Sequence, residues 1–208
     1  HSILERYGMS ETIMLTSNPY RPDSRHAGQD ERRGGTVGFP LPGVSLRVQD
    51  DTGRTLGAGE VGGIQVKGPN VFGGYWRMPE KTAEEFTADG FFKTGDVGQV
   101  DERGYVRIVG RSKDLIISGG YNVYPREVED ALRLHPAVQD AAVVGAPDAE
   151  WGEVVTAYCE TDGTVTGNEL IRFVGEHLAF YKRPKRVTMV DALPRNALGK
   201  VVKGELGR

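Results

Sequence analysis

Four short stretches of the sequence gather side chains that can do polar chemistry. The first, residues 6–12, combines an aromatic ring, a glycine, a hydroxyl and a carboxylate. Tyr7 beside Gly8 can present its ring face where backbone comes close. Ser10 offers a hydroxyl and Glu11 a hard oxygen ligand, so the set suits an aromatic base, a phosphate oxygen and Mg²⁺. Taken alone, the stretch is equally well an ordinary turn at the end of a strand.

The other three stretches each carry polar groups that have either a functional role or only an ordinary structural one. In residues 90–98, Asp96 follows a glycine; it either forms a tight turn by bonding its own backbone or accepts two hydroxyls of a ribose. Residues 110–125 hold a charged run and a Ser-Gly-Gly loop, which can also be a solvated linker. Residues 194–200 form a loop that ends in Lys200, and most surface lysines have no specific role.

Composition and charge exclude several classes of protein. The 208 residues are 38% hydrophobic and 26% charged, with a net charge of −3. The overall charge therefore gives no electrostatic attraction to nucleic acid or to a membrane surface. The single cysteine, Cys159, excludes an internal disulfide; it lies in a predicted strand and is expected to be a packing residue rather than a catalytic thiol. No apolar run approaches the roughly 20 residues of a membrane span, and no secretory leader is visible. We expect a cytoplasmic protein.

The elements that position the first two stretches are predicted to be strands. Between residues 35 and 110, short apolar segments alternate with turn signals. Strands so short, with such turns, are typical of a small antiparallel sheet or barrel. A helix over residues 79–86, with proline at an early position, interrupts them. The predicted strands cover residues 44–48, 63–67, 95–100 and 105–109.

The pattern changes after residue 110 and predicts a second, α+β unit of about 95 residues. A helix begins at Pro125, and strands follow over residues 140–144, 154–161 and 186–190. Thr166 and Glu169 form a capping-box pattern at the start of another helix. That helix is expected to bury Leu170, Ile171, Phe173, Val174 and Leu178.

Together, the four stretches occur in the order and spacing of the adenylate-forming superfamily of acyl-CoA synthetases, luciferases and peptide-synthetase adenylation domains. The sequence resembles that superfamily from about residue 6 to 203, and the segments 59–64 and 74–76 carry a further signature. The resemblance implies that residues 1–110 are the carboxy-terminal portion of the large nucleotide- and acid-binding domain. It implies a hinge at 111–114 and a small mobile α+β lid domain over 115–208.

The resemblance also implies an ATP or AMP site, whose members are Tyr7, Gly8, Met9, Ser10, Asp96 and Arg111. Tyr7 would stack on adenine, and Asp96 with Arg111 would hold the ribose. Ser10 would touch the α-phosphate, where relatives more often have threonine.

Catalysis and domain motion would depend on three further positions implied by the resemblance. Glu11 would help to bind Mg²⁺, and Lys200 would reach from the lid to the acyl carboxylate and the α-phosphate. Lys113 matches the hinge position, where relatives carry aspartate or lysine.

Coenzyme A would be the acceptor, and the second unit has features that suit it. Residues 177–208 hold eight Lys or Arg against two Asp or Glu, a local net charge of +6. Such a surface favours the phosphates of CoA, and glycines let a pantetheine arm pass close to backbone. The alternative is a solvated charged face with a core tryptophan. The candidates are Gly119, Gly120, Trp151, Arg183 and Lys185.

Residues 5–20, 35–45 and 68–82 look like malonyl-CoA synthetases, including those that take methylmalonate. Arg6 and Met14 are candidates for contact with the acid. We expect the phosphate loop and a carboxylate-binding arginine in a missing amino-terminal part, so the isolated chain should be inactive. An aryl or fatty acyl-CoA synthetase, or a non-catalytic nucleotide- or CoA-binding fragment, remain alternatives.

Overall fold

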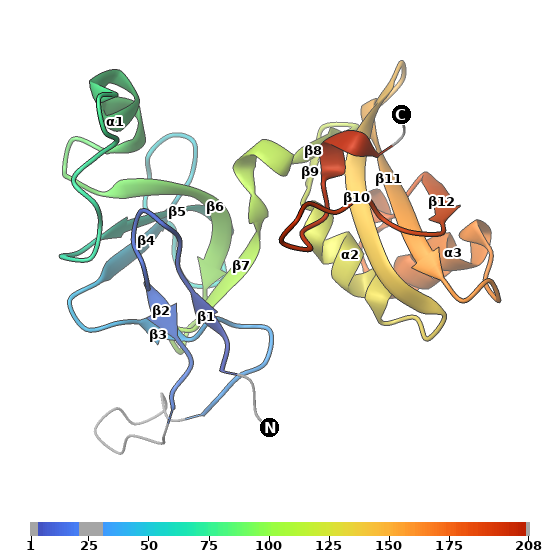
Figure 1. Ribbon diagram of the computed structural model, residues 1–208, viewed down its shortest axis with the longest axis horizontal. Helices are drawn as coiled ribbons and strands as arrows, with labels where there is room; N and C mark the ends of the chain where they lie inside the picture. Colours follow the sequence, from blue (N-terminus) through green and yellow to red (C-terminus); the bar gives the residue numbers. More distant parts are fainter. Residues whose placement is uncertain (1–3, 21–30, 207–208) are drawn as a thin grey trace. The chain divides into compact units, whose positions relative to one another are not determined.

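The computed structural model describes residues 4–20 and 31–206, and the chain divides into two compact units, His1–Ser112 and Lys113–Arg208 (Figure 1). The division falls between Ser112 and Lys113, inside the segment predicted as a hinge. The roles of the two units as the end of a large domain and a lid remain predictions. No helix among the described residues is long and apolar enough to cross a membrane.

The first unit is built on two antiparallel sheets, as the turn-rich pattern predicts, whereas closure into a barrel stays a prediction. A three-stranded sheet has the order β1 (Arg6–Tyr7), β2 (Thr16–Ser17) and β3 (Phe39–Pro40). A four-stranded sheet has the order β4 (Ser45–Gln49), β5 (Gly62–Lys67), β6 (Phe92–Val100) and β7 (Val106–Arg111). Helix α1 (Pro79–Glu85) begins at the predicted proline.

The core of this unit lies against β5 and β6. In β5 the alternation of side chains between the two faces buries Ile64 and Val66, which are 1% and 0% exposed. Phe92 at the start of β6 meets Phe72 edge-on, with ring centroids 5.3 Å apart. Because this core fixes where β6 begins, it also fixes the position of the acidic residue four places further along that strand.

The second unit combines one sheet with two helices (Figure 1). Four strands of the sheet follow one another in the order β10 (Val138–Asp148), β11 (Gly152–Thr161), β8 (Ile116–Ser118) and β9 (Tyr121–Val123), and each neighbouring pair is antiparallel. A fifth strand, β12 (Arg186–Val190), pairs with β11 in parallel. The α-helices are α2 (Pro125–Arg133) and α3 (Gly167–His177). Short 3₁₀ turns are η1 (Ser112–Asp114), η2 (Phe180–Lys182) and η3 (Lys203–Glu205).

Two predictions about strands and the cysteine can be compared with this sheet. The predicted strands at 140–144 and 154–161 are parts of one long hairpin, whose register runs from Val138 opposite Thr161 to Asp148 opposite Gly152. Cys159 is fully buried, and burial raises the pKa of its thiol to about 11. A thiol that stays protonated inside the core fits a packing role.

Helix α3 starts as predicted but buries less than predicted. The side chain of Thr166 accepts the Glu169 N–H, and the Glu169 carboxylate accepts the Thr166 N–H, which is a complete capping box. Of the five residues expected inside, Leu170 and Val174 are fully buried; the other three, Ile171, Phe173 and Leu178, are only partly buried. The expectation was wrong for Ile171 and Phe173, because a short helix on one face of a sheet presents a narrow apolar stripe. Leu178, which follows the last residue of α3, still packs against the core.

Candidate functional site

Three predicted residues from distant stretches meet in the first unit. Tyr7 lies on β1, and the β6–β7 register places Asp96 directly opposite Arg111. The Tyr7 hydroxyl donates a hydrogen bond to Asp96 Oδ2 at 2.5 Å, and Arg111 Nε lies 2.7 Å from Asp96 Oδ1. One partner thus holds each carboxylate oxygen, so the plane of the carboxylate is fixed.

Asp96 is buried, whereas Arg111 reaches solvent. Asp96 is 4% exposed, and the Arg111 side chain keeps 46% of its surface. Burial, and then the hydrogen bond to Asp96, raise the pKa of Tyr7 far above its ordinary value, so Tyr7 remains a neutral donor. A carboxylate oxygen has two lone pairs, and among residues 4–20 and 31–206 each Asp96 oxygen uses one and keeps one. Two free acceptors on neighbouring oxygens match the two hydroxyls of a vicinal diol.

The turn explanation of Asp96 is wrong. Asp96 lies inside β6, which begins at Phe92, and the register of β6 against β7 shifts just after it, between Val97 and Gly98. Gly95, with φ of +71°, supplies the unusual backbone conformation beside it. A cavity of about 530 Å³ opens here; Lys93, Gly95, Asp96 and Ser112 are among its lining residues. Asp96 is therefore held by the sheet and faces space that a ligand can occupy.

The turn after β1 carries the other polar groups of the first stretch. The Thr12 and Ile13 N–H groups both donate to the Met9 carbonyl, at 3.1 and 2.7 Å. A Cβ on Gly8 would lie 1.9 Å from the Ile13 carbonyl oxygen, so only glycine fits where the chain folds back. Ser10 is exposed on this turn and is free to meet a ligand.

Glu11 is half-buried on the same turn, and it accepts a hydrogen bond from a residue of the 74–76 signature to which the sequence assigned no role in the site. The Tyr75 hydroxyl donates to Glu11 Oε1 at 3.3 Å. Among the residues the structure describes, no three His, Cys, Asp or Glu side chains converge. Mg²⁺ is commonly held by one or two carboxylates together with substrate phosphates, so a half-buried carboxylate such as Glu11 fits that cation when a nucleotide supplies the remaining ligands.

Asn70 was also missed as a member of this region. Its Nδ2 donates to the Thr12 and Met14 carbonyls, at 2.9 Å each, and so holds the turn in place. Asn70 lies in the 68–82 segment, which indicated the resemblance to malonyl-CoA synthetases but no role for Asn70 in the site. Of the two acid-contact candidates, Arg6 is exposed and Met14 is half-buried, and neither lines the cavity beside Asp96.

Three of the CoA candidates meet in the second unit. The Lys185 ammonium lies 4.0 Å from the ring centroid of Trp151, a cation–π contact. The Gly119 N–H donates to the Trp151 carbonyl at 3.0 Å, and a Cβ on Gly119 would lie 2.5 Å from the indole ring. Arg183 stands over the Phe180 ring at 4.9 Å. Gly120, with φ of +83°, continues the exposed loop. These contacts bring aromatic rings and basic groups together beside a glycine loop.

Lys200 ends an exposed turn of the second unit. Leu198 at the tip is 92% exposed, and Lys200 itself is exposed. Within residues 4–20 and 31–206, no carboxylate lies within ion-pair distance of its ammonium group. Lys113 is likewise exposed, in η1. Both side chains therefore reach solvent.

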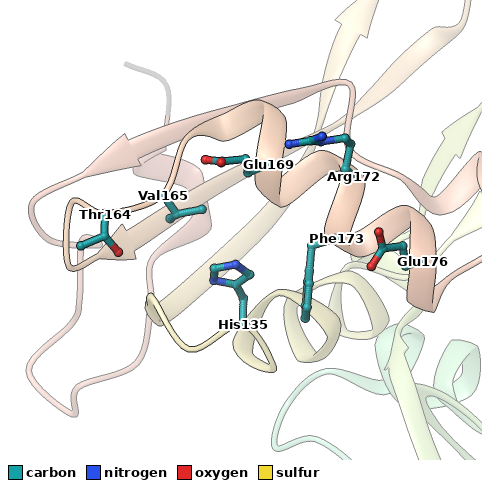
Figure 2. Close-up of a pocket in the computed structure, with 7 residues that line it drawn as sticks. All are labelled: His135, Thr164, Val165, Glu169, Arg172, Phe173 and Glu176. Atoms are coloured by element: carbon teal, nitrogen blue, oxygen red, sulfur yellow. The ribbon is translucent and has the colours of Figure 1, made fainter.

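A different cavity, of about 420 Å³, contains none of the predicted site residues. Figure 2 shows it between α3 and the end of α2, with the rings of Phe173 and His135 close together. Their centroids are 4.8 Å apart, and His135 Nδ1 accepts the Ala137 N–H. The Glu169 carboxylate is occupied by the capping box. The fold itself therefore uses two of the polar groups of this cavity, His135 and Glu169.

The family models and the curated relatives that match this chain point to the same family of enzymes. One family model, described as AMP-binding enzyme, matches residues 1–76, and a second, the AMP-binding enzyme C-terminal domain, matches residues 127–200. A malonate–CoA ligase of Arabidopsis thaliana is 44% identical over 99% of this chain and 34% of its own length. A long-chain-fatty-acid–CoA ligase of Yersinia pestis is 38% identical over 98% of this chain and 35% of its own.

Solved structures agree with the family models. The crystal structure of ATP-bound MatB from Rhodopseudomonas palustris is 53% identical and matches with a TM-score of 0.89, covering 98% of this chain and 40% of that chain. This chain thus spans about a third of the length of the two curated relatives and two fifths of the solved protein.

Proposed function

Because this chain belongs to the adenylate-forming superfamily of AMP-binding enzymes, we propose that it forms the nucleotide-holding part of an ATP-dependent acid–thiol ligase. A carboxylate oxygen of the acid attacks the α-phosphorus of ATP, the bond to pyrophosphate breaks, and an acyl-AMP results. The sulfur of CoA then attacks the acyl carbonyl, and AMP leaves. Malonate or methylmalonate is the proposed acid.

One observation carries the proposal: Asp96 is fixed by Tyr7 and Arg111 with one acceptor left on each oxygen. A ribose presents two neighbouring hydroxyls to such a carboxylate. Because both partners are already in place, little conformational freedom is lost when the nucleotide binds. The Tyr7 ring, whose hydroxyl is tied to Asp96, is the proposed stacking surface for adenine.

Charge explains the proposed roles of the other residues. Two anions approach each other when the acid attacks ATP, so positive charge placed in advance stabilises the transition state. Lys200 is the proposed donor of that charge, with Ser10 at the α-phosphate. Mg²⁺, held by Glu11 and the phosphates, would supply further positive charge. Rotation about Lys113 would exchange Lys200 for the Gly119–Gly120 loop before CoA reacts.

The proposed acid rests on resemblance and on the identities of 53% to MatB and 44% to the Arabidopsis malonate–CoA ligase. The long-chain-fatty-acid–CoA ligase is nearly as similar, at 38%. A fatty or aryl acid is therefore the second candidate. A nucleotide- or CoA-binding fragment without catalysis is a further one for the isolated chain.

The experiment uses the full-length protein, meaning the natural polypeptide in which this sequence occurs. Pyrophosphate release and CoA thioester formation are measured with ATP and each of malonate, methylmalonate, octanoate and benzoate. We expect turnover with the two dicarboxylates and little with the others. If only octanoate or benzoate is turned over, the substrate is that acid and not a dicarboxylate. If no acid causes pyrophosphate release, the proposed ligase activity is wrong.

A further inference from the structure

The turn that carries Lys200 is held in one shape by its own side chains. The Asn196 N–H donates to the Lys200 carbonyl and the Gly199 N–H to the Asn196 carbonyl, at 2.9 Å each. Asn196 Oδ1 accepts the N–H groups of Leu198 and Lys200, at 3.0 Å each. Gly199, with φ of +78°, takes a conformation that favours glycine. Four bonds thus fix the backbone of a turn that is otherwise open to solvent.

Arg195 connects this turn to the sheet. Its Nη1 donates to the Gly199 carbonyl at 3.1 Å, and its Nη2 donates to Asp140 Oδ2 at 2.5 Å and to Glu160 Oε1 at 3.4 Å. Glu160 Oε1 also accepts the Leu193 N–H at 2.7 Å. One guanidinium therefore bridges the turn to two carboxylates on the neighbouring strands β10 and β11, which suits its fixed fork of donors.

Asp140 is itself held from the other side. Its Oδ1 accepts Arg133 Nε at 2.9 Å and the Ala141 N–H at 2.8 Å. Burial alone would raise the pKa of Asp140, but the hydrogen bonds from Arg195 and Arg133 hold it below its usual value. The anchor is therefore a charged group at neutral pH, placed between two arginines and part of a strand rather than of a loop.

From these contacts we propose that Arg195 and Asn196 are positioning residues for Lys200, and that Asp140 is the anchor of Arg195. The proposal rests on the proposed role of Lys200 in acyl-AMP formation. A fixed backbone at Lys200 would limit where its flexible side chain can place the ammonium group. This matters because a displacement of about 1 Å from the reacting atoms can lower a rate by about 10²-fold. The bonds fix the backbone at Lys200 and leave its ammonium group free to meet the ligand.

The test uses the full-length protein with Asp140→Asn and Arg195→Gln. Acyl-AMP formation is followed by single-turnover pyrophosphate release, and the second step by thioester formation from supplied acyl-AMP. We expect each substitution to slow the first step about tenfold to a hundredfold, as for a misplaced group, and to leave the second step unchanged. Asp130→Asn is the matched control, because Asp130 also pairs with Arg133, at 3.2 Å, whereas the described carboxylate partners of Arg195 are Asp140 and Glu160.

A double substitution separates positioning from general damage. In a Lys200→Ala background, Asp140→Asn should cause no further loss of pyrophosphate release, because it acts through Lys200. Asn196→Ala should slow the first step, and Asn196→Asp, which keeps the acceptor oxygen, should restore most of it. Amide hydrogen exchange at Leu198 and Lys200 should rise in Asp140→Asn whatever the activity of the protein.

The outcomes distinguish this proposal from the proposed function. If Lys200→Ala leaves pyrophosphate release intact, the role of Lys200 fails and the positioning role fails with it. If Lys200→Ala abolishes the step while Asp140→Asn and Arg195→Gln do not slow it, only the positioning role is overturned. Equal losses from Asp140→Asn in both backgrounds, or in both half-reactions, would also overturn it.

Discussion

Asp96 and Lys200, the two charged groups on which the proposed reaction most depends, are held in opposite ways. Asp96 is 4% exposed, and side chains from two other strands fix both of its oxygens. Lys200 is exposed, and the structure fixes its backbone rather than its side chain. The first arrangement suits a group that must recognise the same part of a ligand throughout. The second suits a group that must enter and leave a site.

Substitution of the exposed group should have the largest effect on rate. Lys200→Ala in the full-length protein should slow acyl-AMP formation about 10²–10³-fold, the size expected for loss of one preorganised charge contact. Thioester formation from supplied acyl-AMP should stay nearly normal. The two half-reactions are measured separately, with Lys203→Ala, a nearby lysine paired with Glu129 at 2.6 Å, for comparison. Equal loss of rate in both half-reactions would contradict the proposal that Lys200 enters the site for the first step and leaves it before the second.

Substitution of the buried group should act on binding instead. Asp96→Ala removes the acceptors for the proposed ribose contact and leaves Arg111 without its partner. Hydrogen bonds to charged groups contribute about 1.5–3 kcal/mol, so ATP affinity should fall about tenfold to a hundredfold, while CoA affinity changes little. Calorimetric titration of both ligands checks this. Asp89→Ala, which removes an exposed carboxylate paired with Arg47, is the control. A larger loss for CoA would remove Asp96 from the ribose site.

The aromatic surface of the second unit gives a smaller test. Gly119→Ala places a methyl group in contact with the Trp151 ring, at a backbone φ of +56° that disfavours a side chain. We expect CoA affinity to fall several-fold through displacement of the indole, with ATP affinity unchanged. Indole fluorescence reports the displacement independently of binding. Gly163→Ala, at a φ of +82° in open space, controls for strain alone. An unchanged CoA affinity with a shifted indole would exclude this surface.

The smallest expected effect sharpens the account of Asp96. Tyr7→Phe keeps the ring and removes one hydrogen bond to a carboxylate, of about 1.5–3 kcal/mol. That bond acts on ATP only through the orientation of Asp96, so about 1 kcal/mol of it should appear in binding and ATP affinity should fall about fivefold. The deficit should shrink for 2′,3′-dideoxy-ATP, since that ligand makes no bond to Asp96. Tyr105→Phe, which removes a hydroxyl bonded to the Glu31 carbonyl at 2.6 Å, is the matched control. A deficit of the same size for both nucleotides would mean that the hydroxyl acts on folding rather than on Asp96.

The sequence by itself determined which side chains to consider and most of the elements that carry them. Pro79, Pro125 and the Thr166–Glu169 pair start helices because proline and the capping box act locally. The motif spacing was enough to indicate the family that the comparisons then supported. The residues that make up each of these signals lie close together along the chain, so they can be recognised without knowledge of the tertiary structure.

Only the tertiary structure decided how those side chains are held. That Asp96 lies in a strand, with Tyr7 89 residues away as its donor, follows from sheet register. The contacts of Tyr75 with Glu11 and of Asp140 with Arg195 join residues 64 and 55 positions apart. Such pairs leave no periodic pattern in the sequence, because they depend on how strands align and not on the residues beside them.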